Sequence, residues 1–217
     1  MATTIKVDIV SDTICPWCFI GKRRLEKAIT SYQVSHPDTK FDIKWHPFEL
    51  DPTLSKTPAN KLERYAAKFG AAKVDGLVEH MKRMGKGDGI NFSYGGPIAN
   101  TIDSHRLIEW ASKQGKQDEV IEQLFKLYFE DEGNIGDLDQ LADVAGKIGL
   151  DKVEALEYLK TDKGTREIKD AILQSQMEGI SGVPNFTIDS KYTLSGAQQP
   201  ETFLEVFEEV GKRLAKA

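Results

Sequence analysis

Alternating apolar and polar residues predict β-strands at both ends of the chain. Over residues 5–9, apolar side chains alternate with Lys6 and Asp8, and residues 41–46 show the same period of two. The period of two returns near the other end, over residues 186–194. Strand-forming segments are therefore expected close to both termini.

The long middle of the chain has a helical period instead. Apolar residues recur there at intervals of three and four, which is typical of amphipathic helices. These stripes fall at residues 62–69, 74–84, 107–111, 120–128, 138–148, 156–159 and 168–172, with a last one at 203–210. Residues 86–97 are rich in glycine and end in proline, so they predict a long irregular loop, and such loops are often functional.

The order of these segments predicts one α/β domain that is interrupted by helices. Two strands at either end would not make a stable sheet alone, whereas the two pairs together would. We therefore predict that residues 1–56 and 180–217 form the two parts of one α/β domain. Residues 57–179 are expected to form an inserted helical domain.

Two cysteines mark the start of the first predicted helix, whose apolar residues recur at helical spacing over residues 25–32. Cys15 and Cys18 are the only cysteines among the 217 residues, and they enclose Pro16 and Trp17. Proline is favoured in the first helical turn, so Cys15 is expected at the N-cap and Cys18 one turn inside. The positive end of the helix dipole favours the thiolate, which is the attacking species in thiol–disulfide exchange. This placement predicts Cys15 as an exposed nucleophile and Cys18 as a shielded resolving thiol.

Other uses of the cysteine pair fit the sequence less well. Half of a zinc site has the same spacing, but there is no second cysteine pair and the four histidines show no ligand spacing, so no metal is expected. A structural disulfide would close almost no loop and would constrain the unfolded chain little. The basic residues Lys22, Arg23 and Arg24 would favour a thiolate if they faced one, but a solvated helix face is expected for them.

Composition limits the partners and the compartment. The net charge is −5, and 29% charged with 40% apolar residues is an ordinary balance for a globular protein. Nothing in this balance indicates nucleic-acid binding, and no apolar run approaches the ~20 residues that span a bilayer. The first residues lack the features of a secretory signal, although a mature form without its signal would look the same. We expect a cytoplasmic protein with no membrane or nucleic-acid partner.

Several motifs resemble those of a known family. Residues 11–21 carry the CPWC string, and further matching pieces lie at residues 47–50, 100–107, 182–186 and 195–198. Together they resemble the thioredoxin superfamily, its DsbA-like branch and, within that branch, the FrnE-type proteins. The resemblance covers nearly the whole chain. It implies a thioredoxin-like fold with a large all-helical insertion domain.

The resemblance also implies roles for individual residues. In this family the peptide bond before a late proline is cis and faces the cysteine pair, which here is the Val183–Pro184 bond. The Val183 backbone would then bind an extended substrate segment as an added strand, which makes both residues candidates for substrate binding. Pro16 and Trp17 would modulate the site. Trp17 stands where the better-known oxidant of the family has histidine.

The expected function is that of a thiol–disulfide oxidoreductase. Cys15 would form a mixed disulfide with a substrate and Cys18 would resolve it, with no cofactor beyond the redox-active disulfide. The expected partners are thiol or disulfide proteins or glutathione, and glutathione is a candidate co-substrate.

Two other functions stay open at this point. One is a glutathione-dependent isomerase or transferase of the kappa or hydroxychromene-carboxylate isomerase type. Those proteins resemble this chain but have serine at the first position, so the two thiols argue against it. The other is a non-enzymatic redox-sensing or chaperone-like module. The sequence also leaves open whether the protein is a monomer or a homodimer, and what His105, Glu49 and His46 do.

Overall fold

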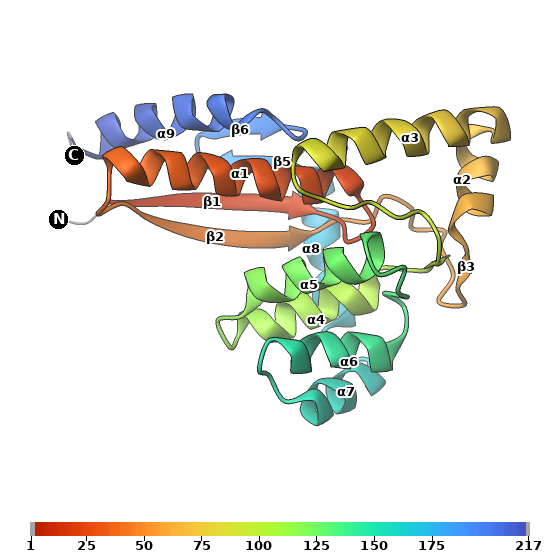
Figure 1. The fold of residues 1–217 in the computed structure, drawn as a ribbon. Coiled ribbons are helices and arrows are strands. Elements are labelled where there is room, and N and C mark those ends of the chain that lie inside the picture. Colours follow the sequence, from red (N-terminus) through yellow and green to blue (C-terminus); the bar gives the residue numbers. More distant parts are fainter. Residues whose placement is uncertain (1–2, 216–217) are drawn as a thin grey trace.

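A computed structural model describes residues 3–215 and places a four-stranded sheet at the centre of the protein (Figure 1). The strands lie in the order β2-β1-β5-β6, with β1 parallel to β2 and antiparallel to β5. Their bounds are Thr4–Ser11 for β1, Lys40–Pro47 for β2, Asn185–Ile188 for β5 and Tyr192–Ser195 for β6. The sheet thus combines strands from both ends of the chain, as the alternating pattern predicts.

Two long helices cover one face of the sheet (Figure 1). α1 spans Pro16–Ser35, α9 spans Pro200–Leu214, and the two helices pack against each other. Aromatic rings join them: the centroids of Tyr32 in α1 and Phe207 in α9 are 5.7 Å apart. Because β1 leads directly into α1 through a short turn, the start of α1 lies at the end of the central strand.

The segment between β2 and β5 is helical. Its helices are α2 (Lys61–Phe69), α3 (Ala71–Gly87), α4 (Ile102–Ser112), α5 (Gln117–Phe129), α6 (Leu138–Lys147), α7 (Lys152–Lys160) and α8 (Thr165–Met177). α4 to α7 lie on the opposite side of the sheet from α1, while α2 and α3 extend beyond the end at which β1 stops (Figure 1). The short strands β3 (Ala59–Asn60) and β4 (Pro97–Ile98) pair with each other, and two residues are too short a pattern to predict.

This arrangement confirms the predicted α/β class, with helices between two halves of one sheet. The exact borders proposed for the inserted domain, residues 57 and 179, stay a prediction.

Local signals explain where the helices begin. Asn60, Asp137 and Asp151 are N-cap residues whose side chains accept hydrogen bonds from the backbone of the first turn.

The segment after α3 has no regular structure over residues 88–96, as its glycines predict, but much of it is buried. Residues 88–96 are irregular, but they carry Phe92 and Tyr94 into the core. The Phe92 ring packs on Phe129, with ring centroids 5.3 Å apart. Gly85 allows the Phe92 ring to pack closely against α3, because a Cβ at this position would lie 2.3 Å from the ring. The segment is therefore part of the core rather than a free surface loop.

The basic residues that follow the cysteines are also placed differently from the prediction. The Lys22 side chain is 3% exposed and the Arg24 side chain 6%, so these two residues do not form a solvated face. Lys22 forms ion pairs with Asp118 and Glu122 of α5, and Arg24 pairs with Asp88 after α3. The reason is that α1 packs against the inserted helices as well as the sheet. Acidic residues of the insertion then supply the partners that buried charges require.

Replacing Glu122 by glutamine is expected to lower the free energy of unfolding at pH 7 by about 1–3 kcal/mol, because it takes a partner from Lys22 and Arg23. Burial alone would raise the pKa of Glu122, but the hydrogen bond from Arg23 and the charges of Lys22 and Arg23 lower it to about 2. The carboxylate therefore stabilises the fold fully above its ordinary value of 4.5, and this effect is lost as the pH falls toward 2. Denaturant unfolding at pH 7 and pH 3 measures the deficit, which should be smaller at pH 3.

Glu119 provides a matched control on the same helix. Its side chain is 46% exposed and pairs with Lys116 at the surface. Glu119→Gln is therefore expected to change the free energy of unfolding by no more than about 0.5 kcal/mol. A deficit for Glu122→Gln that is equally large at both pH values would contradict the role given to its charge.

Candidate functional site

Cys15 and Cys18 lie at the start of α1, next to the end of β1. Cys15 is the N-cap residue, with an extended backbone (φ −90°, ψ 111°), and Pro16 opens the helix. The Cys15 N–H donates to the Asp12 carbonyl over 3.0 Å, and the Cys18 N–H donates to the Cys15 carbonyl over 3.0 Å. Both cysteines are free thiols. The predicted position of Cys15 at the N-cap is confirmed.

Cys15 is, however, much less exposed than the sequence predicts. Its relative exposure is 3%, against 0% for Cys18. The expected exposure of Cys15 is wrong, because residues of α2 and α3 pack around the space beside it. Its role as nucleophile stays a prediction, and Cys15 is, as predicted, the more exposed of the two cysteines. Sequence patterns predict the helices but not this packing. Cys15 lines a cavity that is partly open to solvent.

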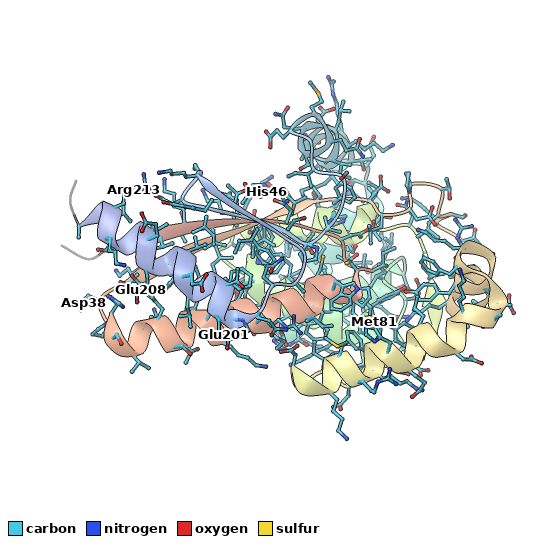
Figure 2. The ribbon with its side chains drawn as sticks, turned by 90° about the horizontal axis from the view of Figure 1, so that it is seen from above. Asp38, His46, Met81, Glu201, Glu208 and Arg213 are labelled. Atoms are coloured by element: carbon cyan, nitrogen blue, oxygen red, sulfur yellow. The ribbon has the colours of Figure 1, made fainter. Side chains whose placement is uncertain are left out.

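The cavity beside Cys15 has a volume of about 340 Å³. Its walls are mostly apolar and come from α1, α2, α3 and the segments around Leu50 and Val183. Figure 2 shows Met81, one of the wall residues, between α3 and the start of α1. Three charged side chains also border the space: Asp51, Arg64 and Lys68. A molecule that reaches Cys15 through this cavity therefore meets mostly apolar walls with charged side chains at the border.

The Val183–Pro184 peptide bond lies beside Cys15 and is cis. The Cys15 Sγ donates to the Val183 carbonyl over 3.5 Å. β5 begins directly after this bond and pairs with the end of β1, which fixes the position of the loop. Gly21 allows α1 to approach, because a Cβ there would lie 3.2 Å from Pro184. The fold thus brings Val183 and Pro184 to the cysteine pair, although Val183 lies 168 positions after Cys15 in the sequence.

The two thiols have different surroundings. Burial raises the pKa of Cys18 well above its ordinary value, and the neighbouring Cys15 raises it further. Hydrogen bonds from the Ser11 side chain and the Asp12 backbone act in the opposite direction but do not compensate. Cys18 is therefore a neutral thiol at physiological pH and has no access to the cavity.

Three tyrosines of the inserted segment lie close together on the side of the cavity that α2 forms, and the sequence does not predict them. Tyr65 of α2 lines the cavity, Tyr94 lies in the segment after α3, and Tyr128 lies in α5. Burial raises the pKa of Tyr65 to about 12, and burial also raises the pKa of Tyr94 and that of Tyr128. Each of the three follows an apolar pattern that is typical of core positions. No local signal distinguishes them, because their relation to Cys15 exists only in the folded chain.

The three residues whose roles the sequence leaves open each have a structural partner. The buried His105 has its Nε2 atom 2.9 Å from the Phe48 carbonyl. Glu49 accepts a hydrogen bond from the Asn100 side chain over 3.1 Å, and His46 pairs with an aspartate of β1 over 2.8 Å. None of the three is among the residues that line the cavity.

Metal chemistry finds no support in the part of the chain that the structure describes. Across residues 3–215, no group of three or more His, Cys, Asp or Glu side chains is arranged to hold a metal ion. The helices within the same range are all too short or too polar to cross a membrane. The reactive groups that line the cavity are the Cys15 thiol and the Tyr65 phenol, with Cys18 buried behind Cys15.

Comparison with known proteins establishes the family. The model of the DSBA-like thioredoxin domain matches residues 6–208, so the chain belongs to this family. The predicted membership of the DsbA-like branch and the thioredoxin-like fold with a helical insertion are confirmed. The narrower FrnE type stays a prediction.

Individual relatives agree with this assignment. YwbO, an uncharacterized protein of Bacillus subtilis (strain 168), is 27% identical over 213 residues, which is 97% of this chain and 99% of YwbO. The crystal structure of the probable DsbA oxidoreductase SCO1869 from Streptomyces coelicolor matches with a TM-score of 0.85 at 27% identity, covering 94% of this chain and 89% of the other. The cytosolic disulfide reductase DsbM from Pseudomonas aeruginosa, solved with GSH, matches with a TM-score of 0.63 at 14% identity over 95% and 99% of the two chains. At that identity the likeness is one of fold alone.

Proposed function

We propose that this protein is a thiol–disulfide oxidoreductase in which Cys15 attacks and Cys18 resolves. The observation that carries the proposal is the asymmetry of two free thiols, since Cys15 borders a cavity and Cys18 is fully buried with a raised pKa. A substrate can reach only the sulfur at the cavity. Cys15 is the N-cap residue of α1, so its sulfur lies at the N-terminal end of the helix. Pro16 and Trp17 are the adjacent wall of the cavity and would limit access.

In the proposed reaction the Cys15 thiolate attacks one sulfur of a substrate disulfide. The substrate S–S bond breaks, a Cys15–substrate disulfide forms, and the other substrate sulfur leaves as a thiolate and takes up a proton. Cys18 then loses its proton and attacks the Cys15 sulfur, which releases the second substrate thiol. Two electrons have passed from the Cys15–Cys18 dithiol to the substrate. Two external thiols, for which glutathione is our candidate, reduce the pair again and become a disulfide themselves.

The cavity supports a narrow substrate. A space of about 340 Å³ with mostly apolar walls suits a small disulfide or one extended peptide segment better than a folded protein surface. Lys68 on its border offers positive charge to carboxylates, which glutathione carries, whereas the neighbouring Arg64 already pairs with Asp51 over 2.7 Å. A peptide segment would lie along the Val183 backbone. DsbM, which shares the fold, is described as cytosolic and as bound to GSH, and this favours glutathione and a cytoplasmic location here.

Cys18→Ser tests the proposed roles. When the reduced variant is mixed with oxidised glutathione, we expect a stable glutathione adduct on Cys15, because the thiol that would displace it is absent. Mass spectrometry of the intact protein and its peptides locates the adduct. The wild-type protein should instead accumulate the Cys15–Cys18 disulfide.

Cys15→Ser is the matched control. The remaining Cys18 is 0% exposed, so it should stay unmodified under the same conditions. An adduct on Cys18, or the absence of any adduct in Cys18→Ser, would contradict the proposal.

A further inference from the structure

Arg64 of α2 and Asp51, in the segment between β2 and β3, meet at the border of the cavity beside Cys15. Their ion pair is 2.7 Å long, and both side chains line the cavity. The Arg64 side chain is 36% exposed and the Asp51 side chain 12%. A molecule bound in the cavity beside Cys15 would therefore meet this ion pair.

The ion pair uses only part of the Arg64 guanidinium group. A single terminal nitrogen, Nη2, donates to the Asp51 carboxylate over 2.7 Å and to the Thr53 hydroxyl over 2.8 Å. The Nε atom is buried and has no hydrogen-bond acceptor within residues 3–215. A buried donor without an acceptor is unfavourable, whereas an arginine can hold a carboxylate through two parallel hydrogen bonds. The contact with Asp51 thus leaves Arg64 able to bind a better-placed carboxylate.

Asp51 is held in place by its own turn as well as by Arg64. Its Oδ1 atom accepts hydrogen bonds from the backbone N–H of Thr53, over 3.2 Å, and from the Thr53 hydroxyl. The Leu54 N–H donates to the Asp51 carbonyl over 3.2 Å. Because these bonds do not involve α2, Arg64 can exchange Asp51 for another carboxylate while the turn stays formed.

Lys68 adds a second positive charge one turn further along α2. Residues four apart lie on the same side of a helix, so Arg64 and Lys68 are neighbours, and two like charges at this spacing are unfavourable by themselves. Among the described residues that line the cavity, Asp51 is the only acidic one. The border of the cavity therefore carries more positive than negative charge, although the net charge of the chain is −5. This excess favours a substrate that brings a negative charge.

We propose that Arg64 binds a carboxylate of the substrate and that Asp51 occupies Arg64 while the cavity is empty. The inference rests on the proposed function, since it concerns the substrate that reacts at Cys15. It names the substrate class as disulfides that carry a carboxylate. The substrate carboxylate replaces Asp51 on the guanidinium group and also accepts from Nε, so Asp51 acts as an internal competitor.

Two small disulfides of similar size test the inference. Dithiodipropionate carries two carboxylates, whereas hydroxyethyl disulfide carries two hydroxyls. The reduced full-length protein is mixed with each over a range of concentrations, and formation of the Cys15–Cys18 disulfide is followed by acid quenching and mass spectrometry. Each rate constant is divided by that of dithiothreitol with the same disulfide, which removes the intrinsic reactivity of the disulfide. The ratio of the two normalised values measures the carboxylate preference.

We expect Arg64→Gln to lower the carboxylate preference about tenfold, because it removes charge-assisted hydrogen bonds to the substrate. Arg64→Lys keeps the charge but not the planar fork, so it should lower the preference only about threefold. The change should appear in the concentration of dithiodipropionate that gives half the maximal rate and not in the maximal rate, since Arg64 binds and does not react.

Asp51→Asn tests the competitor role. We expect it to raise the carboxylate preference about threefold, because the amide keeps the acceptor for Thr53 but loses the charge that holds Arg64. The same substitution in an Arg64→Gln protein should give no gain, because the competitor then has nothing to release. An Asp51→Asn protein without a gain, or with the same gain in both backgrounds, would overturn the competitor role.

Two control variants change a charge on the same helices but outside the cavity. Glu63→Gln on α2 and Arg83→Gln on α3 should leave the carboxylate preference unchanged. A folded Arg64→Gln protein with the wild-type preference would overturn the inference. It would leave the proposed function intact as long as both disulfides still oxidise the cysteine pair. A wild-type protein that neither disulfide oxidises would contradict the proposed function, and the inference with it.

Discussion

Replacing Cys15 by serine is expected to lower the rate of disulfide reduction at least about a thousandfold. Serine has nearly the same size, so the packing at this buried position changes little, but its hydroxyl is not ionised near neutral pH and forms no disulfide. The expected loss therefore lies in the chemistry and not in the fold. The measurement is the turnover of a small disulfide with glutathione as reductant, beside thermal unfolding of both proteins.

Cys18→Ser separates this effect from general damage to the site. It should lose repeated turnover through Cys18 but still react once at Cys15, because the attacking sulfur is intact. Turnover that survives in a folded Cys15→Ser protein would show that the cysteine pair is not the reacting group. A binding or chaperone-like role would then explain the family fold better.

Replacing Arg106 by methionine is expected to lower the free energy of unfolding by about 3–5 kcal/mol. The Arg106 side chain is 1% exposed. Its Nε and two terminal nitrogens donate five hydrogen bonds, one to the Asp103 carboxylate and four to backbone carbonyls. The carbonyls belong to Tyr158, Leu159, Thr161 and Lys163. Methionine fills much of the space but removes five donated hydrogen bonds, and the buried Asp103 carboxylate then keeps only its ion pair with Lys56.

Arg166→Met is the control, because the Arg166 side chain is 92% exposed. Its effect should stay within about 0.5 kcal/mol. Denaturant unfolding of both variants gives the comparison. A loss of less than about 1 kcal/mol for Arg106→Met would show that the turn after α7 does not depend on this side chain.

The elements of the fold were predictable because their signals are local. Alternation marks β1, spacing of three and four marks the helices, and Pro16 after Cys15 marks the start of α1. The cysteine pair could be recognised for the same reason, since its spacing and its place at a helix start are visible in eleven residues of sequence, 11–21.

The surroundings of the pair could not be predicted, because they depend on contacts between distant segments. Cys15 is covered by helices from the insertion, and Lys22 is buried because Asp118 and Glu122 come from α5 to pair with it. Tyr65 falls on an apolar stripe, and nothing in its own helix shows that it lines the same cavity as Cys15. Local patterns thus locate the reacting atoms, whereas their environment follows from how the inserted helices pack.

Equilibration of the protein with glutathione buffers of graded ratio tests the central claim, that Cys15 and Cys18 act as one redox pair. Acid quenching, alkylation and mass spectrometry give the populations of dithiol, intramolecular disulfide and glutathione adduct. We expect one reversible two-electron transition between the dithiol and the Cys15–Cys18 disulfide, with little adduct at its midpoint. A pair that never forms this disulfide, or that gives only a glutathione adduct on Cys15, would contradict the account.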